Sequence, residues 1–434
     1  MNILQIASLL IVLAATFGTI NYMVFRLPSA IGILVVALLA SLGVLALEFV
    51  YPASNVEETI TSVVKGIEFS DALLEGMLGL LLFAGALHVK IADLRAEWPA
   101  VLLMATMGVG LSTAIAGFGF SWITGMPLLI ALVFGALISP TDPVAVLGVL
   151  RDAKLDKRLE TKIAGESLFN DGVGYVVYLV LIGLAFPTAG GGHGESHVVA
   201  EAGHLAAEGA QHNASPIADA TILFAQEALG GMALGLALGW LAWRVMRRID
   251  DYSLEVLITL ALAFGGYELA IWLHVSAPIM AVCAGLIIGE VSYRDAMTEQ
   301  TRRYVDAFWK LIDEILNAVL FLLIGVELFA VTFETSFILS AIAALVLALV
   351  ARFAAVAIPV LLLRPFHKMP DNVIPVMTWG GLKGGISIAL ALSLPDSEWK
   401  PMILTTTYVI VLFSIIVQGL TVAPFAKRLN KMST

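Results

Sequence analysis

The sequence predicts an all-α polytopic membrane protein, and three observations support this fold class. The 434 residues are 59% hydrophobic and only 13% charged, with a mean hydropathy of +0.94, which excludes a soluble globular protein. Apolar runs long enough to cross about 30 Å of hydrocarbon recur along the whole chain. Nearly all Lys and Arg residues lie in alternate connections between these runs, as the positive-inside rule predicts for a chain that crosses a bilayer repeatedly.

The apolar runs predict about 13 transmembrane helices in a single transmembrane domain, residues 1–434. Each run ends in polar or helix-breaking residues, where we place the connections. In chain order, the predicted helices cover residues 3–25, 29–49, 72–90, 98–123, 128–149, 163–186, 220–243, 254–273, 277–293, 308–330, 335–363, 372–394 and 402–426.

The basic residues indicate which side of the membrane each connection faces. If the C-terminus lies in the cytoplasm, all but four of the 24 Lys and Arg residues fall in cytoplasmic segments. Of the four exceptions, Lys65 and Lys400 would face outside, while Arg352 and Lys383 lie within helices. We therefore expect an external N-terminus, a cytoplasmic C-terminus and a location in a cell (inner) membrane.

The longest predicted connection, residues 187–219, is rich in His and Gly and would lie outside. It carries four of the seven His residues and no Lys or Arg. A segment of this composition is typically a flexible solvated loop. The alternative is that it binds a metal ion or senses pH through His193, His197, His204 and His212.

Two predicted helices are interrupted at comparable distances from the middle of the chain. The fifth contains SPTDP at residues 139–143, and the twelfth contains GGLKGG at residues 380–385. Proline removes a backbone donor and clustered glycines weaken a helix. Paired breaks in opposite halves are typical of transporters with inverted repeats, in which two broken helices cross at the midplane and hold an ion. The alternative is that these residues merely kink and pack the helices.

The sixth predicted helix contributes further polar groups at the same depth. Ser167 and Asp171 are four residues apart and share one helix face, while Glu166 and Asn170 share the neighbouring face. A carboxylate within the bilayer costs roughly 2.5–3.5 kcal/mol, so such residues usually serve a function. Carboxylate, hydroxyl and carbonyl oxygens suit Na⁺ or Li⁺. A proton can compete for the same carboxylate, because burial disfavours its charged form.

Three segments, SPTDPVAV, GESLFNDG and GGLKGGIS, resemble the signature segments of the NhaP-type Na⁺/H⁺ exchangers of the monovalent cation:proton antiporter-1 family. The resemblance covers essentially the whole chain and implies the NhaA/NhaP-like antiporter fold, a homodimer and a role in pH homeostasis. The adjacent Asn170 and Asp171 are similar to the electroneutral branch of the family, which implies that one cation exchanges for one proton.

The resemblance also implies roles for individual residues. The Na⁺ ligands would be Asp171, Asp142, Ser167 and the main-chain carbonyl of Thr141. Asn170 would support the unwound region, and Glu75 would take part through water. Glu166 and Arg352 would form a buried structural ion pair between the sixth and eleventh helices. Lys383 stands where the family usually has Arg; it would neutralise the half-helix ends without an arginine's planar set of donors.

Asp313, Glu314 and Asn317 follow a basic stretch at the start of the tenth predicted helix. Their side chains would either reach the membrane interface or form a funnel for cations on the cytoplasmic side. His88, near the inner end of the third helix, would be an interfacial residue or contribute to the pH response.

The resulting hypothesis is a secondary transporter in which Na⁺ (or Li⁺) and H⁺ compete for Asp171 and the site opens to each side alternately. The alternatives are a K⁺/H⁺ antiporter of the same fold and a gated cation channel. No enzymatic activity is expected, because no catalytic Ser, His or metal constellation lies in the apolar segments. We expect no cofactor and no nucleic-acid partner, and the lipid bilayer is the expected environment.

Overall fold

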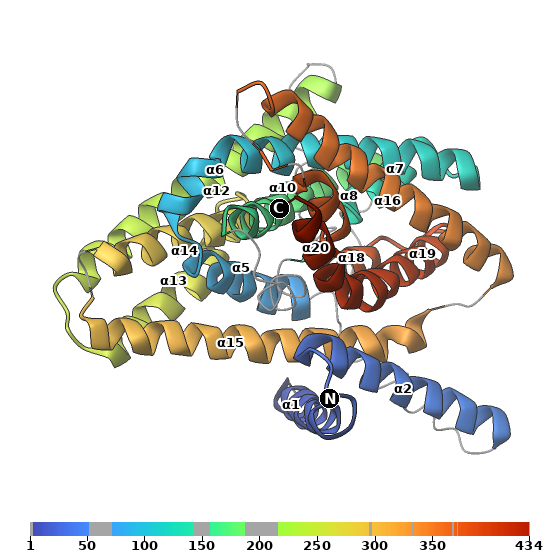
Figure 1. The fold of residues 1–434 in the computed structure, drawn as a ribbon, viewed down its shortest axis with the longest axis horizontal. Helices are drawn as coiled ribbons and strands as arrows, with labels where there is room; N and C mark the ends of the chain where they lie inside the picture. Colours follow the sequence, from blue (N-terminus) through green and yellow to red (C-terminus); the bar gives the residue numbers. More distant parts are fainter. Residues whose placement is uncertain are drawn as a thin grey trace.

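The computed structural model describes residues 3–51, 72–142, 157–186, 216–294, 297–331, 334–366, 369–370 and 372–433, and these residues contain helices and no strand. Eight helical stretches among them are long and apolar enough to cross a membrane, and three shorter apolar helices accompany them. The predicted all-α polytopic membrane fold is therefore confirmed (Figure 1). The number of 13 transmembrane helices stays a prediction.

The first half of the chain contains α1 (Ile3–Ile20), α2 (Ser29–Val50), α5 (Leu78–Leu87), α6 (Ile91–Leu103), α7 (Val109–Thr124), α8 (Leu128–Leu137) and α10 (Lys157–Ala185). The second half contains α12 (Pro216–Met246), α13 (Tyr252–Trp272), α14 (Ala277–Arg294), α15 (Glu299–Val326), α16 (Thr335–Leu363), α17 (Val373–Trp379), α18 (Gly385–Leu392), α19 (Lys400–Phe413) and α20 (Gly419–Ser433). Short π-helical segments extend or join some of these: η1 (Asn21–Phe25), η3 (Ala72–Met77), η4 (Met104–Gly108) and η7 (Ser414–Gln418). A 3-10 turn, η6 (Glu327–Ala330), follows α15.

Some predicted boundaries are wrong. The helix expected from residue 98 begins at Ile91, and the helix expected from residue 308 begins at Glu299. Both helices begin with polar turns, so a search for apolar runs places their starts too late. In addition, α15 has one buried and one exposed face, which lowers its average hydrophobicity. The predicted external connection 187–219 ends earlier than expected, because α12 begins at Pro216. The remainder of that connection, with its four His residues, lies outside the described residues.

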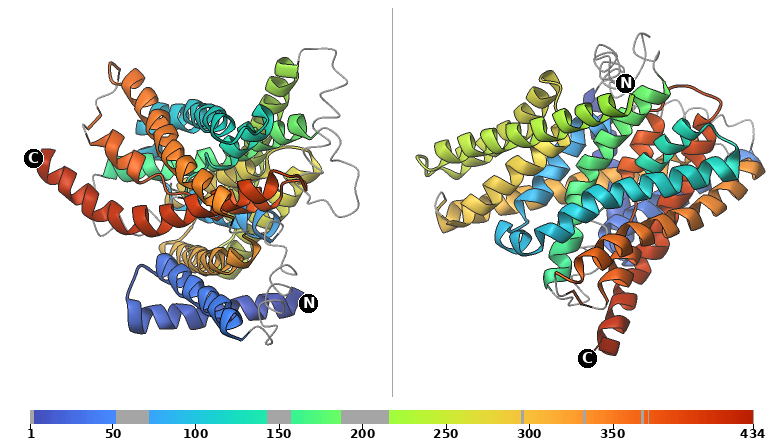
Figure 2. Two further views of the ribbon diagram at one scale, coloured as in Figure 1. Left: turned by 90° about the vertical axis from the view of Figure 1, so that its right-hand side faces the viewer. Right: turned by 90° about the horizontal axis from the view of Figure 1, so that it is seen from above.

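The helices form two bundles. The site bundle consists of α6, α7, α8, α10 and α16 to α20, which pack mainly on one another. The flanking bundle consists of α1, α2, α5 and α12 to α15, with the α1–α2 pair lying against α15 at one side of the molecule (Figure 2). In the site bundle, α10 runs through the centre and also contacts α12 and α14 of the flanking bundle (Figure 1).

Glycines let the helices around the site approach closely. A side chain at Gly135 of α8 would overlap the carbonyl oxygen of Thr113 in α7, so the two helices pack almost backbone to backbone. A Cβ at Gly174 of α10 would lie 2.8 Å from Pro140, just after α8 ends. The second contact holds the segment after α8 against the middle of α10, where the polar residues of the sixth predicted helix lie.

Candidate functional site

The two predicted interruptions meet each other in the structure. The helix α8 ends at Leu137, and residues 139–142 are not helical; α17 ends at Trp379 and α18 begins at Gly385. The backbone N–H of Asp142 donates to the carbonyl oxygen of Leu382 at 2.8 Å. Whether the fifth helix resumes after Asp142 concerns residues 143–150, which lie outside the described residues.

Lys383 connects the two interruptions through its side chain. Its ammonium group donates to the carbonyl oxygens of Ser139 at 2.9 Å and Pro140 at 3.3 Å. These carbonyls follow the C-terminal end of α8, where the helix dipole leaves partial negative charge. Lys383 is buried, so its positive charge compensates these carbonyls and the nearby carboxylates rather than interacting with solvent.

The α10 residues are tied to the first interruption by a network of short hydrogen bonds. The hydroxyls of Thr141 and Ser167 lie 3.0 Å apart. The Asn170 amide nitrogen donates to the Thr141 hydroxyl and to Glu166, both at 2.8 Å, and its oxygen accepts from the Thr141 backbone N–H at 3.3 Å. Asn170 therefore uses both ends of its amide to hold the unwound segment against α10.

Asp171 is the buried carboxylate of this network. Its exposed fraction is 4%, and its Oδ1 atom has no hydrogen-bond partner among the described residues. The charged groups that act on it are Asp142, Glu166 and Lys383. Glu166 is itself paired with Arg352, and the burial of Asp171 disfavours an ionised carboxylate without a counter-charge. A monovalent cation or a proton would supply it.

Glu166 and Arg352 form a bidentate buried ion pair between α10 and α16. The two N–O distances are 2.6 and 2.9 Å, and the guanidinium also donates to the Met377 carbonyl of α17 at 3.1 Å. A side chain at Gly381 would overlap the guanidinium. The pair thus connects α10, α16 and the second interruption. Residue 381 must be glycine because the backbone there lies directly against the Arg352 guanidinium.

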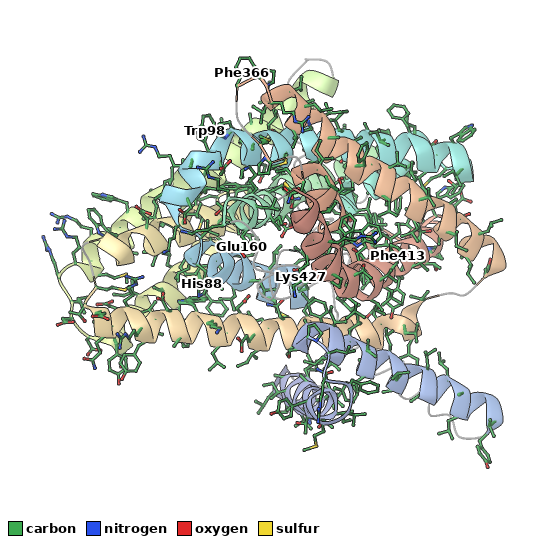
Figure 3. The ribbon with its side chains drawn as sticks, in the orientation of Figure 1. His88, Trp98, Glu160, Phe366, Phe413 and Lys427 are labelled. Atoms are coloured by element: carbon green, nitrogen blue, oxygen red, sulfur yellow. The ribbon has the colours of Figure 1, made fainter. Side chains whose placement is uncertain are left out.

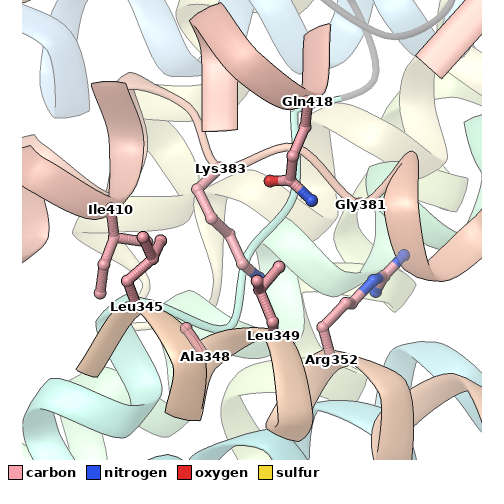
Figure 4. Close-up of a pocket in the computed structure, with 8 residues that line it drawn as sticks. All are labelled: Leu345, Ala348, Leu349, Arg352, Gly381, Lys383, Ile410 and Gln418. Atoms are coloured by element: carbon pink, nitrogen blue, oxygen red, sulfur yellow. The ribbon is translucent and has the colours of Figure 1, made fainter. Parts of the chain in front are cut away.

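A small cavity lies on the side of the second interruption that faces α16 and α19. Arg352, Lys383 and Gln418 are its polar lining residues, and Leu345 and Ile410 are among its apolar ones (Figure 4). Two cationic side chains contribute to its wall and no carboxylate does. The lining of this cavity is therefore unfavourable for a cation.

Two sets of residues around the site were missed from the sequence. Ser414 and Gln418, in the π-helical segment η7, support the second interruption: the Ser414 hydroxyl accepts from the Lys383 N–H at 2.8 Å, and the Gln418 amide donates to the Trp379 carbonyl at 3.3 Å. Lys162 forms a buried ion pair with Glu97 at 2.8 Å, which joins α10 to α6. The sequence could have indicated that Lys162 is buried, because it lies four residues before Glu166 and therefore on the same helix face.

One predicted site residue cannot be placed by its side chain. Glu75 lies in η3, and its side chain is outside the described residues. Within the ranges that the structure describes, no group of three or more His, Cys, Asp or Glu residues could hold a metal ion. A cation at this site would therefore depend on two carboxylates together with hydroxyl and carbonyl oxygens, a ligand set that alkali cations accept.

Comparisons with known proteins point to one family. Residues 10–428 match the family model described as sodium/hydrogen exchanger, transmembrane. The chain is 44% identical to the Na⁺/H⁺ antiporter NhaP of Pseudomonas aeruginosa, with 98% of this chain and 97% of the relative covered. It is 31% identical to the Na⁺/H⁺ antiporter NhaH of Halobacillus aidingensis, with 93% and 92% covered.

The fold also resembles a solved structure, the sodium proton antiporter MjNhaP1 from Methanocaldococcus jannaschii. The TM-score is 0.70 at 18% identity, with 96% of each chain covered. At this level of identity the likeness concerns the fold, and it agrees with the antiporter fold that the resemblance of the signature segments implies.

Proposed function

Because the chain belongs to the sodium/hydrogen exchanger family, we propose that it exchanges Na⁺ (or Li⁺) for H⁺ across a cell membrane. The observation that carries this proposal is the buried carboxylate of Asp171, which has an oxygen without a hydrogen-bond partner in the described structure and lies where two interrupted segments meet. The family is one of transporters rather than enzymes.

The cation is a substrate of the site, and it competes with the proton for Asp171. The ligands would be Asp171, Asp142, the Ser167 hydroxyl and the Thr141 main-chain carbonyl. Glu75 would act through water. The hydrogen bonds of Asn170 and the ion pair of Glu166 support this assignment, because they hold the ligands in place while leaving Asp171 available.

Competition at one carboxylate would also couple the two fluxes. We propose that the site bundle moves relative to the flanking bundle and exposes Asp171 to each side in turn. Moving an ionised, empty carboxylate through the membrane is costly, so the movement would occur when either Na⁺ or H⁺ is bound. A channel, by contrast, would require a path open to both sides at once.

One cation would exchange for one proton. Asn170 is neutral and donates hydrogen bonds to Thr141 and Glu166, so it supplies no second titrating carboxylate next to Asp171. The protein would work as a homodimer in a cell (inner) membrane, with an external N-terminus and a cytoplasmic C-terminus. Its exchange of Na⁺ and H⁺ would serve pH homeostasis.

Transport by purified protein in liposomes with an internal pH dye tests this function. We expect an imposed Na⁺ or Li⁺ gradient to drive H⁺ flux that a membrane potential clamped with valinomycin does not change. Asp171→Asn should abolish the flux. Flux that follows the potential would contradict the one-for-one exchange, and flux driven by K⁺ alone would favour the K⁺/H⁺ antiporter. An ohmic Na⁺ current without H⁺ countertransport would identify a channel.

A further inference from the structure

The π-helical segment η7 (Ser414–Gln418) lies against the second interruption. It follows α19 and precedes α20, whose residues Phe413 and Lys427 are labelled in Figure 3. The side chains of Ser414 and Gln418 are buried, although this segment supplies no proposed Na⁺ ligand. Because π-helical turns inside α-helices often occur at functional sites, these two side chains are candidates for a role at the ion site.

The two side chains bind one backbone group at each end of the interruption. The Gln418 amide nitrogen donates at 3.3 Å to the carbonyl oxygen of Trp379, the last residue of α17, where carbonyls lack helical donors. The Ser414 hydroxyl accepts from the Lys383 N–H at 2.8 Å, just before α18 begins. It donates in turn to Gln418 Oε1 at 2.7 Å. Ser414 and Gln418 therefore bridge the gap between two half-helices as one hydrogen-bonded unit.

The direction of these bonds follows from the donors and acceptors present. A serine hydroxyl donates one hydrogen and can also accept. The Lys383 N–H can only donate and the Trp379 carbonyl can only accept, so Gln418 presents its nitrogen to Trp379 and its oxygen to Ser414. An apolar residue at position 414 or 418 would leave a buried polar group without its partner, which is unfavourable.

The Leu382–Lys383 peptide group connects this unit to the ion site. Its N–H donates to Ser414, and its carbonyl oxygen accepts from the backbone N–H of Asp142 at 2.8 Å. Both groups belong to one planar trans unit, in which they point in opposite directions. Ser414 and Asp142 therefore hold the same plane from opposite sides. If the Ser414 bond is lost, a tilt of this plane displaces the carbonyl that holds Asp142.

The Lys383 side chain extends from the same backbone. Its ammonium group donates to the carbonyl oxygens of Ser139 and Pro140, so a second contact between the two interruptions also depends on where residue 383 lies. Figure 4 shows Gln418 beside the stretch that carries Gly381 and Lys383. The backbone that η7 supports thus contacts the first interruption through a main-chain bond and through a side chain.

We propose that Ser414 and Gln418 are positioning residues of the ion site, which fix the Leu382–Lys383 peptide and through it Asp142, and so set the affinity for Na⁺. A binding site requires its ligands to be held to within a fraction of an ångström, so a small tilt of this peptide weakens binding. The inference rests on the proposed Na⁺/H⁺ exchange and assigns a role in it to a helix that provides no ligand.

Ser414→Ala and Gln418→Met test the inference in liposomes that contain the purified protein. Alanine removes the hydroxyl with little change in volume, and methionine replaces the amide at similar length. We expect Ser414→Ala to raise the KM for Na⁺ about five- to twentyfold while the maximal rate stays within about twofold of the wild type. Gln418→Met should raise the KM less, about threefold, because it leaves the bond between Ser414 and Lys383 in place.

Thr421→Val is the matched control. The exposed Thr421 hydroxyl on α20 accepts from the indole N–H of Trp379 at 2.9 Å. The control therefore also removes a hydrogen bond between this helix and Trp379, but the bond is to the side chain and not to the backbone. Its KM should equal that of the wild type.

The kinetic constant that changes separates positioning from a purely structural role. Loss of folded protein lowers the maximal rate and the unfolding midpoint but leaves the KM of the folded molecules unchanged. A wild-type KM in Ser414→Ala, with or without a lower rate, would therefore overturn the inference. An equal KM increase in Thr421→Val would overturn it too.

If neither Ser414→Ala nor Gln418→Met folds, amide hydrogen exchange of the wild type decides. Sites that are coupled stabilise each other reciprocally, so saturating Na⁺ in place of choline should slow exchange of the Lys383 amide about threefold or more. An unchanged exchange rate would refute the coupling. A wild type that exchanges no Na⁺ for H⁺ would refute the proposed function itself, whereas normal exchange with an unchanged KM in Ser414→Ala would refute only the positioning role.

Discussion

The backbone N–H of Asp142 donates a 2.8 Å hydrogen bond to the carbonyl oxygen of Leu382. This bond joins two interrupted segments that lie far apart in the chain, so the position of the Asp142 carboxylate depends on the backbone of residues 380–384. A change in the second segment should therefore alter cation binding at the first, even when it touches no proposed ligand.

Gly384→Ala tests this dependence. The added Cβ would lie 2.7 Å from the Asp142 Cβ and 2.8 Å from its carboxylate, and backbone strain is not involved because φ at Gly384 is −116°. Displacing Asp142 should raise the KM for Na⁺ about tenfold or more, and the overlap should cost about 1–3 kcal/mol of stability. Gly110→Ala is the control, since nothing lies within 4 Å of its added Cβ. A wild-type KM in Gly384→Ala would show that this contact does not position Asp142.

Glu166→Gln should destabilise the protein far more than the loss of an exposed ion pair. It leaves the buried Arg352 guanidinium without its charged partner, at a cost of about 3–5 kcal/mol. Lys400→Gln, which removes a pair with the fully exposed Asp396, should leave the unfolding midpoint close to that of the wild type, because solvent screens such a pair. The midpoint of thermal unfolding in detergent measures both. Equal midpoints for the two variants would argue against a structural role for the Glu166–Arg352 pair.

Asn170→Asp should impair folding as well as transport. Aspartate cannot donate the 2.8 Å hydrogen bonds to Thr141 and Glu166, and its charge would lie beside the Glu166 carboxylate. We expect a loss of about 1–3 kcal/mol for the unpaired groups, measured by thermal unfolding. Asp171→Asn removes the neighbouring buried charge and should unfold at or above the wild-type temperature. Wild-type stability in Asn170→Asp would mean that its donor bonds matter little.

Competition between Na⁺ and H⁺ predicts a pH-dependent affinity. Protonation of Asp171 blocks the cation, so the KM for Na⁺ should rise as the pH falls, with a limit of about tenfold per pH unit for one proton displaced by one cation. The maximal rate at saturating Na⁺ should depend on pH much less. Initial rates over a range of Na⁺ concentrations at several pH values check this. A KM that stays constant while the maximal rate falls would indicate separate sites for the two ions.

Local features of the sequence predicted the fold class and the parts of the site. Hydropathy located the apolar helices, because burial in a bilayer depends on composition over about 20 residues. The Pro and Gly residues at 139–143 and 380–385 located the interruptions, since their effect on a helix is local. The four-residue spacing of Ser167 and Asp171 placed both on one face of α10.

Contacts between distant segments required the tertiary structure. The bond between Asp142 and Leu382 and the burial of Lys162 against Glu97 both join segments that lie far apart in the chain. A helix pattern specifies which side chains share a face, and the packing of whole helices decides what that face meets. The sequence by itself therefore determined the membrane class, the end of α8 before residues 139–142, the break between α17 and α18 and the polar face of α10. Only the packing of the two bundles decided which carboxylates, carbonyls and cations lie together.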